Sequence, residues 1–411
     1  MLRASDSCDE RSRMRERPFT VSVAGSVAAI GREGWDRLAG TANPFVSYDF
    51  LASLEDSGCV AARTGWEPVH LVAEADGGRV GVAPCYLKSH SMGEYVFDHA
   101  WADAYQRAGG RYYPKLQVSV PFTPANGPRL LVGGADAATA AAGRAALAQG
   151  MEALARQAKA SSVHATFLDD ADRAAFADAG WLARTDQQFH WHNGGYRDFD
   201  DFLSTFRASR RKQVKRERRD ALGARLTIRR LTGADLGEAV WDAFFAFYLD
   251  TGSRKWGRPY LNRSFFSLIG ERMAERILLV VAERDGRPIA GAQNFIGADA
   301  LYGRNWGTLE DLPFLHFELC YYQAIEFAIE RGLARVEAGA QGEHKLARGY
   351  LPVTTHSAHH IVHPGLRRAV AEYLEQERAD IARLGAALAE AAPFKAGEST
   401  AAAARLPEED A

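Results

Sequence analysis

Two stretches of the chain share one pattern of apolar and polar positions. Residues 71–83 read LVAEADGGRVGVA and residues 280–292 read VVAERDGRPIAGA. In each, an apolar run leads through an Asp-Gly pair into a second apolar run, and this pattern predicts a β-hairpin with a tight turn. Val80 of the first copy corresponds to Ile289 of the second. A repeat at this long period predicts two structurally similar halves.

The pattern around each hairpin predicts the same order of elements: helices, hairpin, further strand, long helix, strand. In the first half we expect a strand at 19–25, helices at 30–38 and 47–56, the hairpin at 69–88, a helix at 136–159, a strand at 163–168 and a helix at 171–180. The aromatic-rich stretch 89–117 and the Pro/Gly-punctuated stretch 121–133 connect these elements, and the second of them leads into a strand.

The second half repeats the order after a helical introduction. We expect helices at 199–206 and just beyond it, a strand at 226–231, helices at 235–249 and 262–274, the hairpin at 277–296, a strand at 300–306, a helix at 315–331, a strand at 334–340 and a last helix at 366–390. This order predicts an α/β fold with a sheet that is partly antiparallel and partly parallel. The predicted units are a flexible tail at 1–17, a first domain at 18–195, a second domain at 196–392 and a flexible tail at 393–411.

Composition limits the classes of function. The 411 residues are 47% hydrophobic and 25% charged, with a formal net charge of −2, so no global charge draws the protein to nucleic acid or membrane. We find no apolar run long enough to span a membrane and no signal-peptide core. The four cysteines are scattered, with no metal or disulfide spacing. We therefore expect reduced thiols, a cytoplasmic location, no metal and no tightly bound cofactor.

The order of elements resembles the acyltransferase fold of the GNAT superfamily, and two copies in one chain resemble the Fem-type aminoacyltransferases of peptidoglycan cross-bridge synthesis. The segment LYGRNWGTLEDLPFLHFELCYYQAIEFAIERGLARVEAGAQG carries this likeness. More specifically, residues 43–363 resemble the bacterial FemAB-like predicted N-acyltransferases. The segments NPFVSYDFLASLE, VSVPFTPANGPRLL and GAQGEHKLARGYLPVTTHSAHHI are similar to that family.

The resemblance implies two tandem GNAT-like domains and transfer of an activated acyl group to an amine. Ordinary GNAT enzymes open their long helix with a glycine-rich loop that binds coenzyme A. The corresponding stretch here, 308–316, contains no glycine, so no cradle of successive backbone N–H groups for a pyrophosphate is visible. The expected co-substrate therefore remains either acyl-CoA or aminoacyl-tRNA. The long tRNA-contacting helical arm of some Fem enzymes has no obvious counterpart.

The segment GAQGEHKLARGY, which follows a buried-type strand, concentrates groups that amide formation needs. Glu343 or His344 is a candidate base for the amine, whereas Lys345 and Arg348 are candidate cations for the acyl oxyanion and the leaving group. The resemblance places the active-site lysine of Fem-type enzymes on Lys345 or, through the Arg-Gly-Tyr match, on Arg348. The alternative is a polar surface loop. Tyr350 closes the segment as a candidate substrate contact.

Four histidines fall within THSAHHIVHP, which follows this loop. This cluster has three interpretations. It could be a metal site, a structural strand, or a place where His356 binds the acceptor or transfers a proton. The segment alternates like a strand, which would place His356 and His360 on one face and His359 and His363 on the other.

The strand before the long helix and the aromatic stretch of the first half supply further candidates. In GNAT-like folds that strand diverges from its neighbour and the acyl group enters the gap, so the resemblance makes Arg304 and Asn305 candidate substrate contacts. Trp306 is a contact or a packing residue. In Fem proteins the first domain helps to bind the acceptor, which implies such a role for the polar and aromatic residues Asp98, Trp101, Tyr113, Lys115 and Gln117. An interdomain packing surface is the alternative for these five residues.

A basic run follows the first helix of the second half. Arg210, Arg211, Lys212 and Lys215 are candidate phosphate ligands for tRNA or a nucleotide-linked substrate. A solvated basic helix is the alternative. The sequence thus predicts an N-acyltransferase, in which the first domain recognises the acceptor and the second carries the chemistry. The alternative is a non-catalytic GNAT pair that binds a cell-wall precursor or RNA. Oligomeric state is not indicated.

Overall fold

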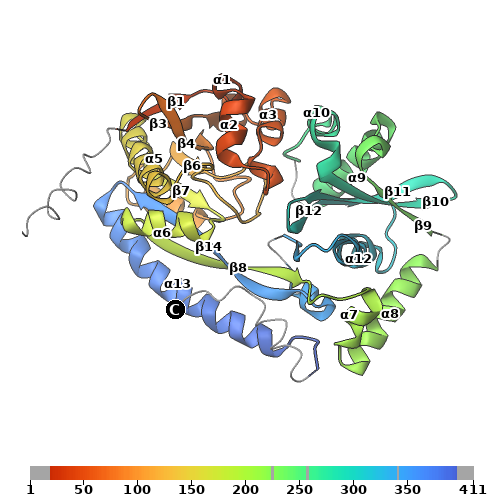
Figure 1. Cartoon of the computed structure of the whole chain (residues 1–411). Coiled ribbons are helices and arrows are strands. Elements are labelled where there is room, and N and C mark those ends of the chain that lie inside the picture. The colour runs from red at the N-terminus through yellow and green to blue at the C-terminus, as the bar shows by residue number, and fades with distance from the viewer. Residues whose placement is uncertain (1–18, 224–225, 256–258, 340–341, 396–411) are drawn as a thin grey trace, which may run out of the picture.

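The computed structural model describes residues 19–223, 226–255, 259–339 and 342–395. Two lobes of mixed strands and helices lie side by side (Figure 1). The mid-chain segment Leu182–His192 and the C-terminal segments Leu351–Ile361 and Pro364–Glu390 run beneath them. Among the described residues no helix is long and apolar enough to cross a membrane. The predicted tail 1–17 lies outside the described residues.

The first half begins with a strand and short helices. Its elements are β1 (Thr20–Ala24), α1 (Val27–Ile30), α2 (Arg32–Ala39), η1 (Pro44–Val46), α3 (Tyr48–Asp56), η2 (Ala62–Thr64), β2 (Trp66–Pro68), β3 (His70–Ala75), β4 (Gly78–Ala83), β5 (Cys85–Lys88), α4 (His99–Arg107), β6 (Lys115–Val118), α5 (Ala137–Gln157), β7 (Ser162–Thr166), α6 (Asp170–Asp178) and β8 (Leu182–His192). The strand predicted after 121–133 is reduced to an isolated bridge between Val82 and Leu131.

The second half repeats the order after two helices. Its elements are α7 (Phe199–Ser204), α8 (Ala208–Leu222), β9 (Leu226–Leu231), η3 (Gly233–Asp235), α9 (Glu238–Lys255), α10 (Arg263–Met273), η4 (Ala274–Arg276), β10 (Ile277–Arg284), β11 (Arg287–Ile296), β12 (Ala300–Thr308), α11 (Leu315–Phe317), the π-helix η5 (Glu318–Tyr322), α12 (Gln323–Glu330), β13 (Arg335–Glu337), η6 (Glu343–Arg348), β14 (Leu351–Ile361) and α13 (Pro364–Glu390). The single helix predicted at 315–331 is therefore interrupted by a π-helical turn.

The two predicted hairpins are confirmed and share their irregularities. Asp76 and Gly77 have φ angles of 52° and 76°, and Asp285 and Gly286 have 51° and 74°, as a tight hairpin turn with two left-handed residues requires. Each hairpin also contains a register shift at the same place. A bulge twists the strands and bends them. The repeat thus extends to the turn and the bulge of each hairpin. The hairpins differ in their surroundings, because β3 and β4 form a separate three-stranded sheet with β1, whereas β10 and β11 belong to a larger sheet.

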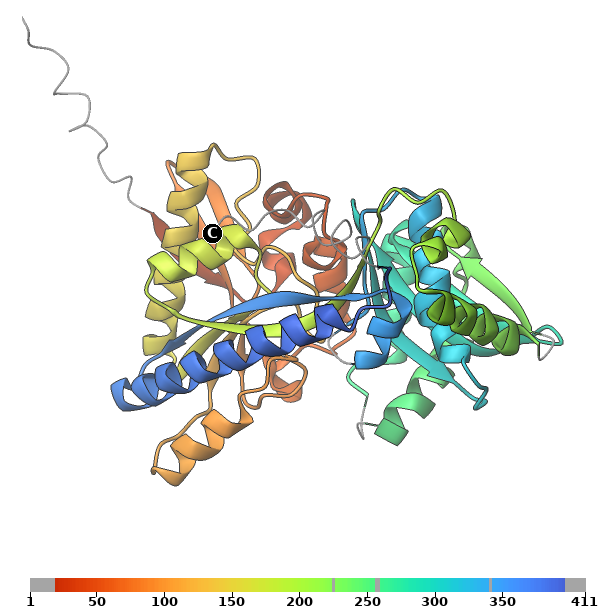
Figure 2. The ribbon, with the colours of Figure 1, turned by 90° about the horizontal axis from the view of Figure 1, so that it is seen from below.

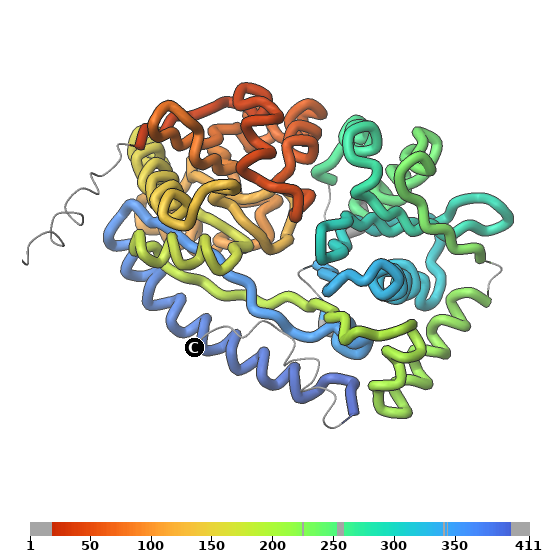
Figure 3. Tube along the Cα trace, viewed as in Figure 1, coloured from red at the N-terminus to blue at the C-terminus, as the bar shows by residue number. Residues whose placement is uncertain are grey.

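Each half completes its sheet with a strand from the other half. Within the described residues, eleven strands form one sheet in the order β2-β5-β6-β7-β14-β8-β13-β12-β11-β10-β9. β14 pairs with β7 of the first half, while β8 pairs with β13 of the second half. Both strands cross between the lobes, and α13 lies along them (Figures 2 and 3). The mixed α/β sheet is confirmed, and the boundary predicted at 195/196 falls just after a strand that both halves share.

Aromatic residues from both halves form one core at the junction. The ring of Phe45 lies 5.0 Å from that of Phe295 and 5.1 Å from that of Tyr302, and the ring of Phe50 lies 5.8 Å from that of Phe265. Because these rings are almost completely buried, the two halves are held together by apolar burial. This part of the junction is therefore a packed interior.

The chain beyond α13 packs against α7 and α8. Phe394 is 4% exposed and its ring lies 5.3 Å from that of Phe206. The backbone N–H of Lys395 donates to the carbonyl of Thr205. Residues 393–395, which the sequence placed in a flexible tail, are thus part of the packed structure, and residues 396–411 lie outside the described part.

Candidate functional site

The candidate site lies where two parallel strands diverge. β12 and β13 pair at Ala300–Arg335, Leu301–Val336 and Tyr302–Glu337, after which β12 leaves β13 and continues to Thr308 paired with β11. The gap forms a hollow of about 90 Å³, here called the small hollow. It is lined by Ala292, Gln293 and Asn294 of β11, Gly303 to Trp306 of β12, His316, Cys320 and Tyr321 of the following helical segment, and Ala338 after β13.

The interrupted helix brings aromatic and sulfur side chains to the small hollow. The π-helical turn Glu318–Tyr322 carries Cys320 and Tyr321, and such turns are frequent at functional sites. The His316 ring lies 5.2 Å from the Trp306 ring and 5.3 Å from the Tyr321 ring. Among the predicted site residues, Arg304, Asn305 and Trp306 therefore do lie together, as the diverging strand implied.

His344 of the predicted catalytic segment reaches the edge of this hollow. Its Nε2 lies 2.8 Å from the Tyr321 hydroxyl, and its side chain is exposed to solvent. His344 is on η6, as is Glu343, whose side chain lies outside the described part of the chain. His344 at the edge of the hollow and His316 in its lining are thus two imidazoles that the structure places here.

Lys345 is buried near Cys320, which lines the same hollow, although Lys345 itself is not part of the lining. It is 3% exposed, and its Nζ donates to the carbonyl of Gly339 at 2.8 Å. Burial lowers the pKa of Lys345 to about 8, and the neighbouring Cys320 acts in the opposite direction. Because an ammonium in an apolar setting acts strongly on nearby charge, Lys345 is suited to stabilise an oxyanion that forms in the hollow.

Arg348 makes a different set of contacts from those of Lys345. Its Nη2 lies 2.9 Å from both carboxylate oxygens of Glu217, and its guanidinium lies 3.4 Å from the centre of the Phe317 ring. Arg348 is 5% exposed and Glu217 is 2% exposed, so this is a buried ion pair. These contacts favour Lys345 over Arg348 as the active-site cation and give Arg348 a structural role.

Two further predicted contacts lie away from the small hollow. Tyr350 is fully buried, with its ring 5.4 Å from that of Tyr321, and its hydroxyl has no hydrogen-bond partner among the described residues. His356 lies on β14, where its carbonyl accepts from the N–H of Leu168 in the first half. The structure therefore does not bring His356 to the lining of the hollow.

The predicted contacts of the first half belong to a buried network. Lys115 Nζ lies 2.7 Å from Glu94 and 2.5 Å from Asp98, and the Tyr112 hydroxyl donates to Asp98 at 2.6 Å. Lys115 and Gln117 are 0% exposed, Asp98 is 2% exposed and Trp101 is 5% exposed. These contacts favour the packing alternative. Tyr113, which is partly buried, has its hydroxyl 2.8 Å from that of Ser91.

His359 and His363 are also engaged away from the small hollow. Nδ1 of His359 lies 2.7 Å from Nδ1 of His164 across the β7–β14 pair. His363 caps α13 by accepting from the N–H of Leu366, so it does not continue the strand as predicted. Among the described residues, no group of three potential ligands could hold a metal ion.

Part of the basic helix α8 is exposed. Arg210, Lys212 and Lys215 are exposed and Arg211 is partly exposed, although Lys215 lies 2.8 Å from Asp200. Arg218 faces inward and pairs with Glu318 and Glu326. The structure therefore presents a basic surface on one side of α8, and the phosphate-binding role of these residues stays a prediction.

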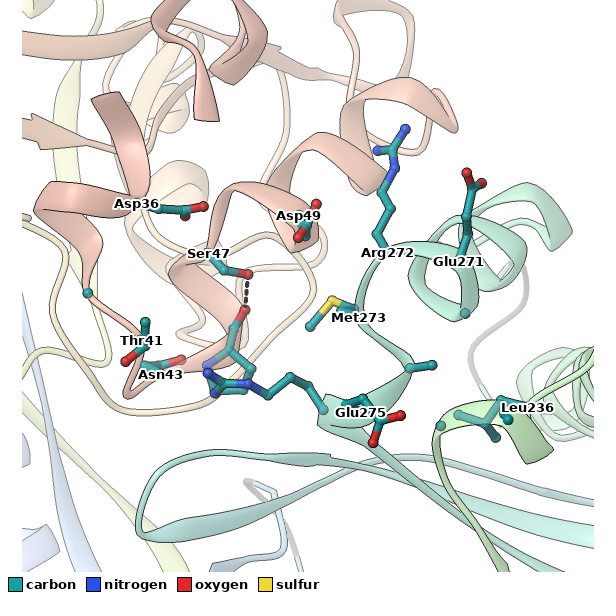
Figure 4. Close-up of a pocket in the computed structure, with 17 residues that line it drawn as sticks. Asp36, Thr41, Asn43, Ser47, Asp49, Leu236, Glu271, Arg272, Met273 and Glu275 are labelled. Carbon is teal, nitrogen blue, oxygen red and sulfur yellow. Dashed lines mark hydrogen bonds between the residues drawn. The ribbon is translucent and has the colours of Figure 1, made fainter. Parts of the chain in front are cut away.

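A larger hollow of about 660 Å³, here called the large hollow, lies between the two halves (Figure 4). Asp36, Ser47 and Asp49 come from the first half. Glu271, Arg272 and Glu275 come from the second half. Two of its charges are paired elsewhere, Asp49 with Arg32 and Arg272 with Asp56. Its volume falls in the range of ligand sites.

The most informative residue that the sequence did not single out is Gln293. It follows the small apolar run IAGA on β11 and is 1% exposed. A polar residue in a strand whose other positions are apolar is unusual, and this pattern could have indicated Gln293 as a candidate. Cys320 and Tyr321 gave no such signal, because a helix of mixed aromatic residues is typical of any core.

Solved structures that are similar to this chain have low sequence identity to it. FemX matches with a TM-score of 0.50 at 12% identity, covering 83% of this chain and 97% of its own, and this likeness shows the fold. A tandem GNAT protein from the clavulanic acid biosynthesis pathway covers 84% and 99% of the two chains, at 14% identity and a TM-score of 0.43. A search of curated protein sequences finds no match.

A sequence family matches almost the whole described chain. The FemAB-like family, described as peptidoglycan biosynthesis/recognition, matches residues 26–396. The match includes both halves, the diverging strands and η6, and it confirms the resemblance expected from the sequence. The chain belongs to the FemAB-like family.

Proposed function

We propose that this protein is an acyltransferase that moves an activated acyl or aminoacyl group to an amine, in a reaction related to peptidoglycan. The observation that carries the proposal is the small hollow between β12 and β13, with the buried Lys345 beside it. The FemAB-like family and its printed role support the same class of reaction.

The chemistry requires an attacking amine, a developing oxyanion and a leaving group. The amine nitrogen forms a bond to the acyl carbon, and the bond between that carbon and its carrier breaks. His344, at the edge of the hollow, accepts the amine proton, and the Lys345 ammonium offsets the charge on the acyl oxygen.

The donor is tested first by binding. A donor that binds the folded protein raises its melting temperature, so we expect a larger shift with acyl-CoA or aminoacyl-tRNA than with the free carrier at equal concentration. Differential scanning fluorimetry over a series of short and long acyl-CoAs and charged tRNAs gives the shift. Mass spectrometry of an added amine mixture then detects the amide. Binding without any amide product would support the non-catalytic alternative.

The basic surface of α8 favours tRNA as the carrier. If Arg210, Lys212 and Lys215 contact phosphates, replacing all three by Gln should lower the slope of log affinity against log salt by about 2–3. Filter binding of tRNA from low to high salt measures this slope. The matched control replaces the exposed Arg156, Arg173 and Arg287, which lie on other surfaces. An unchanged slope in the α8 variant would exclude this surface from binding.

A further inference from the structure

The π-helical turn Glu318–Tyr322 supplies two residues to the lining of the small hollow, Cys320 and Tyr321. Its backbone departs from the regular α-helix, and Phe314, which caps the helical segment before it, has a left-handed φ of 63°. A bulky residue rarely adopts such a φ, and a conformation of this kind persists where the surrounding structure holds it. The shape of this wall of the hollow therefore depends on what packs against the turn.

The inner face of α8 holds the turn at both ends. Nε and Nη2 of Arg218 donate to the two carboxylate oxygens of Glu318, the first residue of the turn, at 3.0 and 2.9 Å. Glu217, the preceding residue of α8, accepts from the hydroxyl of Tyr322, the last residue of the turn. Two consecutive residues of one helix thus fix the turn from outside.

The pair between Arg218 and Glu318 is well suited to fix a position. Two nitrogens of a planar guanidinium meet two oxygens of a carboxylate, and this arrangement sets an orientation as well as a distance. The side chain of Glu318 is 0% exposed and that of Arg218 is 19% exposed, so the surrounding solution screens the pair little. The guanidinium also lies 4.6 Å from the centre of the Phe199 ring, which restricts its own movement.

The position of the turn affects the candidate base of the reaction. The Tyr321 hydroxyl lies 2.8 Å from Nε2 of His344. A shift of the turn therefore moves the hydrogen-bond partner of His344, and with it the part of the hollow that Cys320 lines. A displacement of about 1 Å in a reacting geometry can cost about a hundredfold in rate.

We infer that Arg218 is a positioning residue for the transfer reaction, and that it acts through Glu318 and the π-helical turn on the groups around the small hollow. The inference rests on the proposed function for the effect on rate, and on the contacts of α8 for the hold on the turn. Arg218 is not part of the lining of the hollow and touches no reacting atom in this assignment.

Alkylation of Cys320 by iodoacetamide tests the hold on the turn without any transfer. Arg218→Lys keeps the positive charge but not the planar fork, and Glu318→Gln weakens the same pair from the side of the turn. We expect each variant to raise the rate at Cys320 by about tenfold or more, because a turn released from its ion pair opens more often. The buried Cys59 and Cys85 report global unfolding in the same sample, and their rates should stay within about twofold of the native rates.

Arg230→Lys is the matched control for Arg218→Lys. The side chains of Arg230 and Arg218 are 24% and 19% exposed, and both belong to the same network of ion pairs. Arg230 is linked to Glu318 through Gln323, which accepts from Arg230 and donates to Glu318. We expect this variant to label at Cys320 close to the native rate. A rise equal to that of Arg218→Lys would overturn the inference, because the network as a whole would then hold the turn.

Transfer kinetics test the effect on the reaction. With the donor identified by binding, we expect Arg218→Lys to lower kcat by about tenfold or more and to leave the KM of the donor within about threefold, because groups that act in the transition state are displaced. A normal kcat in this variant would overturn the positioning role.

The two measurements together separate the inference from the proposed function. An unchanged rate at Cys320, or an equal rise at all three cysteines, would overturn the inference and leave the proposed function standing. A rise confined to Cys320, in a protein whose native form transfers no acyl group, would support the hold on the turn and overturn the proposed function.

Discussion

Replacing Lys345 by Ala is expected to lower kcat by about a hundredfold or more, with a small effect on the KM of the donor, because an oxyanion-stabilising charge acts mainly in the transition state. Steady-state kinetics with the donor identified by binding gives both constants. Lys345→Arg keeps a positive charge and should retain more activity than Lys345→Met, which keeps only the length. Near-normal turnover in Lys345→Ala would contradict the assignment.

The pH dependence follows from the lowered pKa of Lys345. The folded protein releases this proton near pH 8, whereas an ordinary lysine holds it to about 10.5. If the ammonium is the active form, kcat falls as the pH rises through about 8. Over the same range the contribution of Lys345 to stability rises, because the unfolded chain binds more protons than the folded chain. If activity falls while stability rises, the loss of activity is due to deprotonation of Lys345 and not to unfolding of the protein. If activity instead rises through pH 8, Lys345 acts as a base.

Breaking the buried pair between Arg348 and Glu217 is expected to destabilise the fold strongly. Glu217→Ala leaves the guanidinium buried without its counter-charge, and also removes the acceptor of the Tyr322 hydroxyl. We expect the free energy of unfolding to fall by about 3–5 kcal/mol, as measured by urea denaturation.

Two variants separate the ion pair from other causes of this loss. Lys215→Ala, on the exposed side of the same helix, should change the free energy by about 0–1 kcal/mol. The double variant Glu217→Leu with Arg348→Met, which removes both charges, should be more stable than Glu217→Ala. If the free energy of unfolding falls by less than about 1 kcal/mol in Glu217→Ala, the ion pair between Arg348 and Glu217 contributes little to the stability of the fold.

The sequence predicted those elements whose signal is local. The Asp-Gly pairs predicted both hairpin turns, because Asp and Gly adopt left-handed φ angles more readily than most residues. The helical spacing of apolar residues predicted most of the helices. The exchange of β8 and β14 was not predicted, because alternation along a strand shows which face is buried but not which strand lies beside it. The π-helical turn Glu318–Tyr322 has no known pattern in the residues and also went unpredicted.

For the site, the sequence located the segments but not the roles of single residues. Lys345 and Arg348 are three positions apart on the same short helix. Only their surroundings distinguish them, because Lys345 is a buried amine that donates to a backbone carbonyl, whereas Arg348 forms a buried ion pair with Glu217. The same holds for Lys115 and Asp98, which neutralise each other in the interior. Charge in a sequence shows that chemistry is available, but burial and partners decide whether a ligand can reach it.

The strand exchange makes the two copies of the repeated unit dependent on each other. Without β14, the edge of β7 would lie open, and without β8 the same would hold for β13. An open edge pairs readily with other chains and invites aggregation. A chain that contained only one copy would therefore have an incomplete sheet with an open edge.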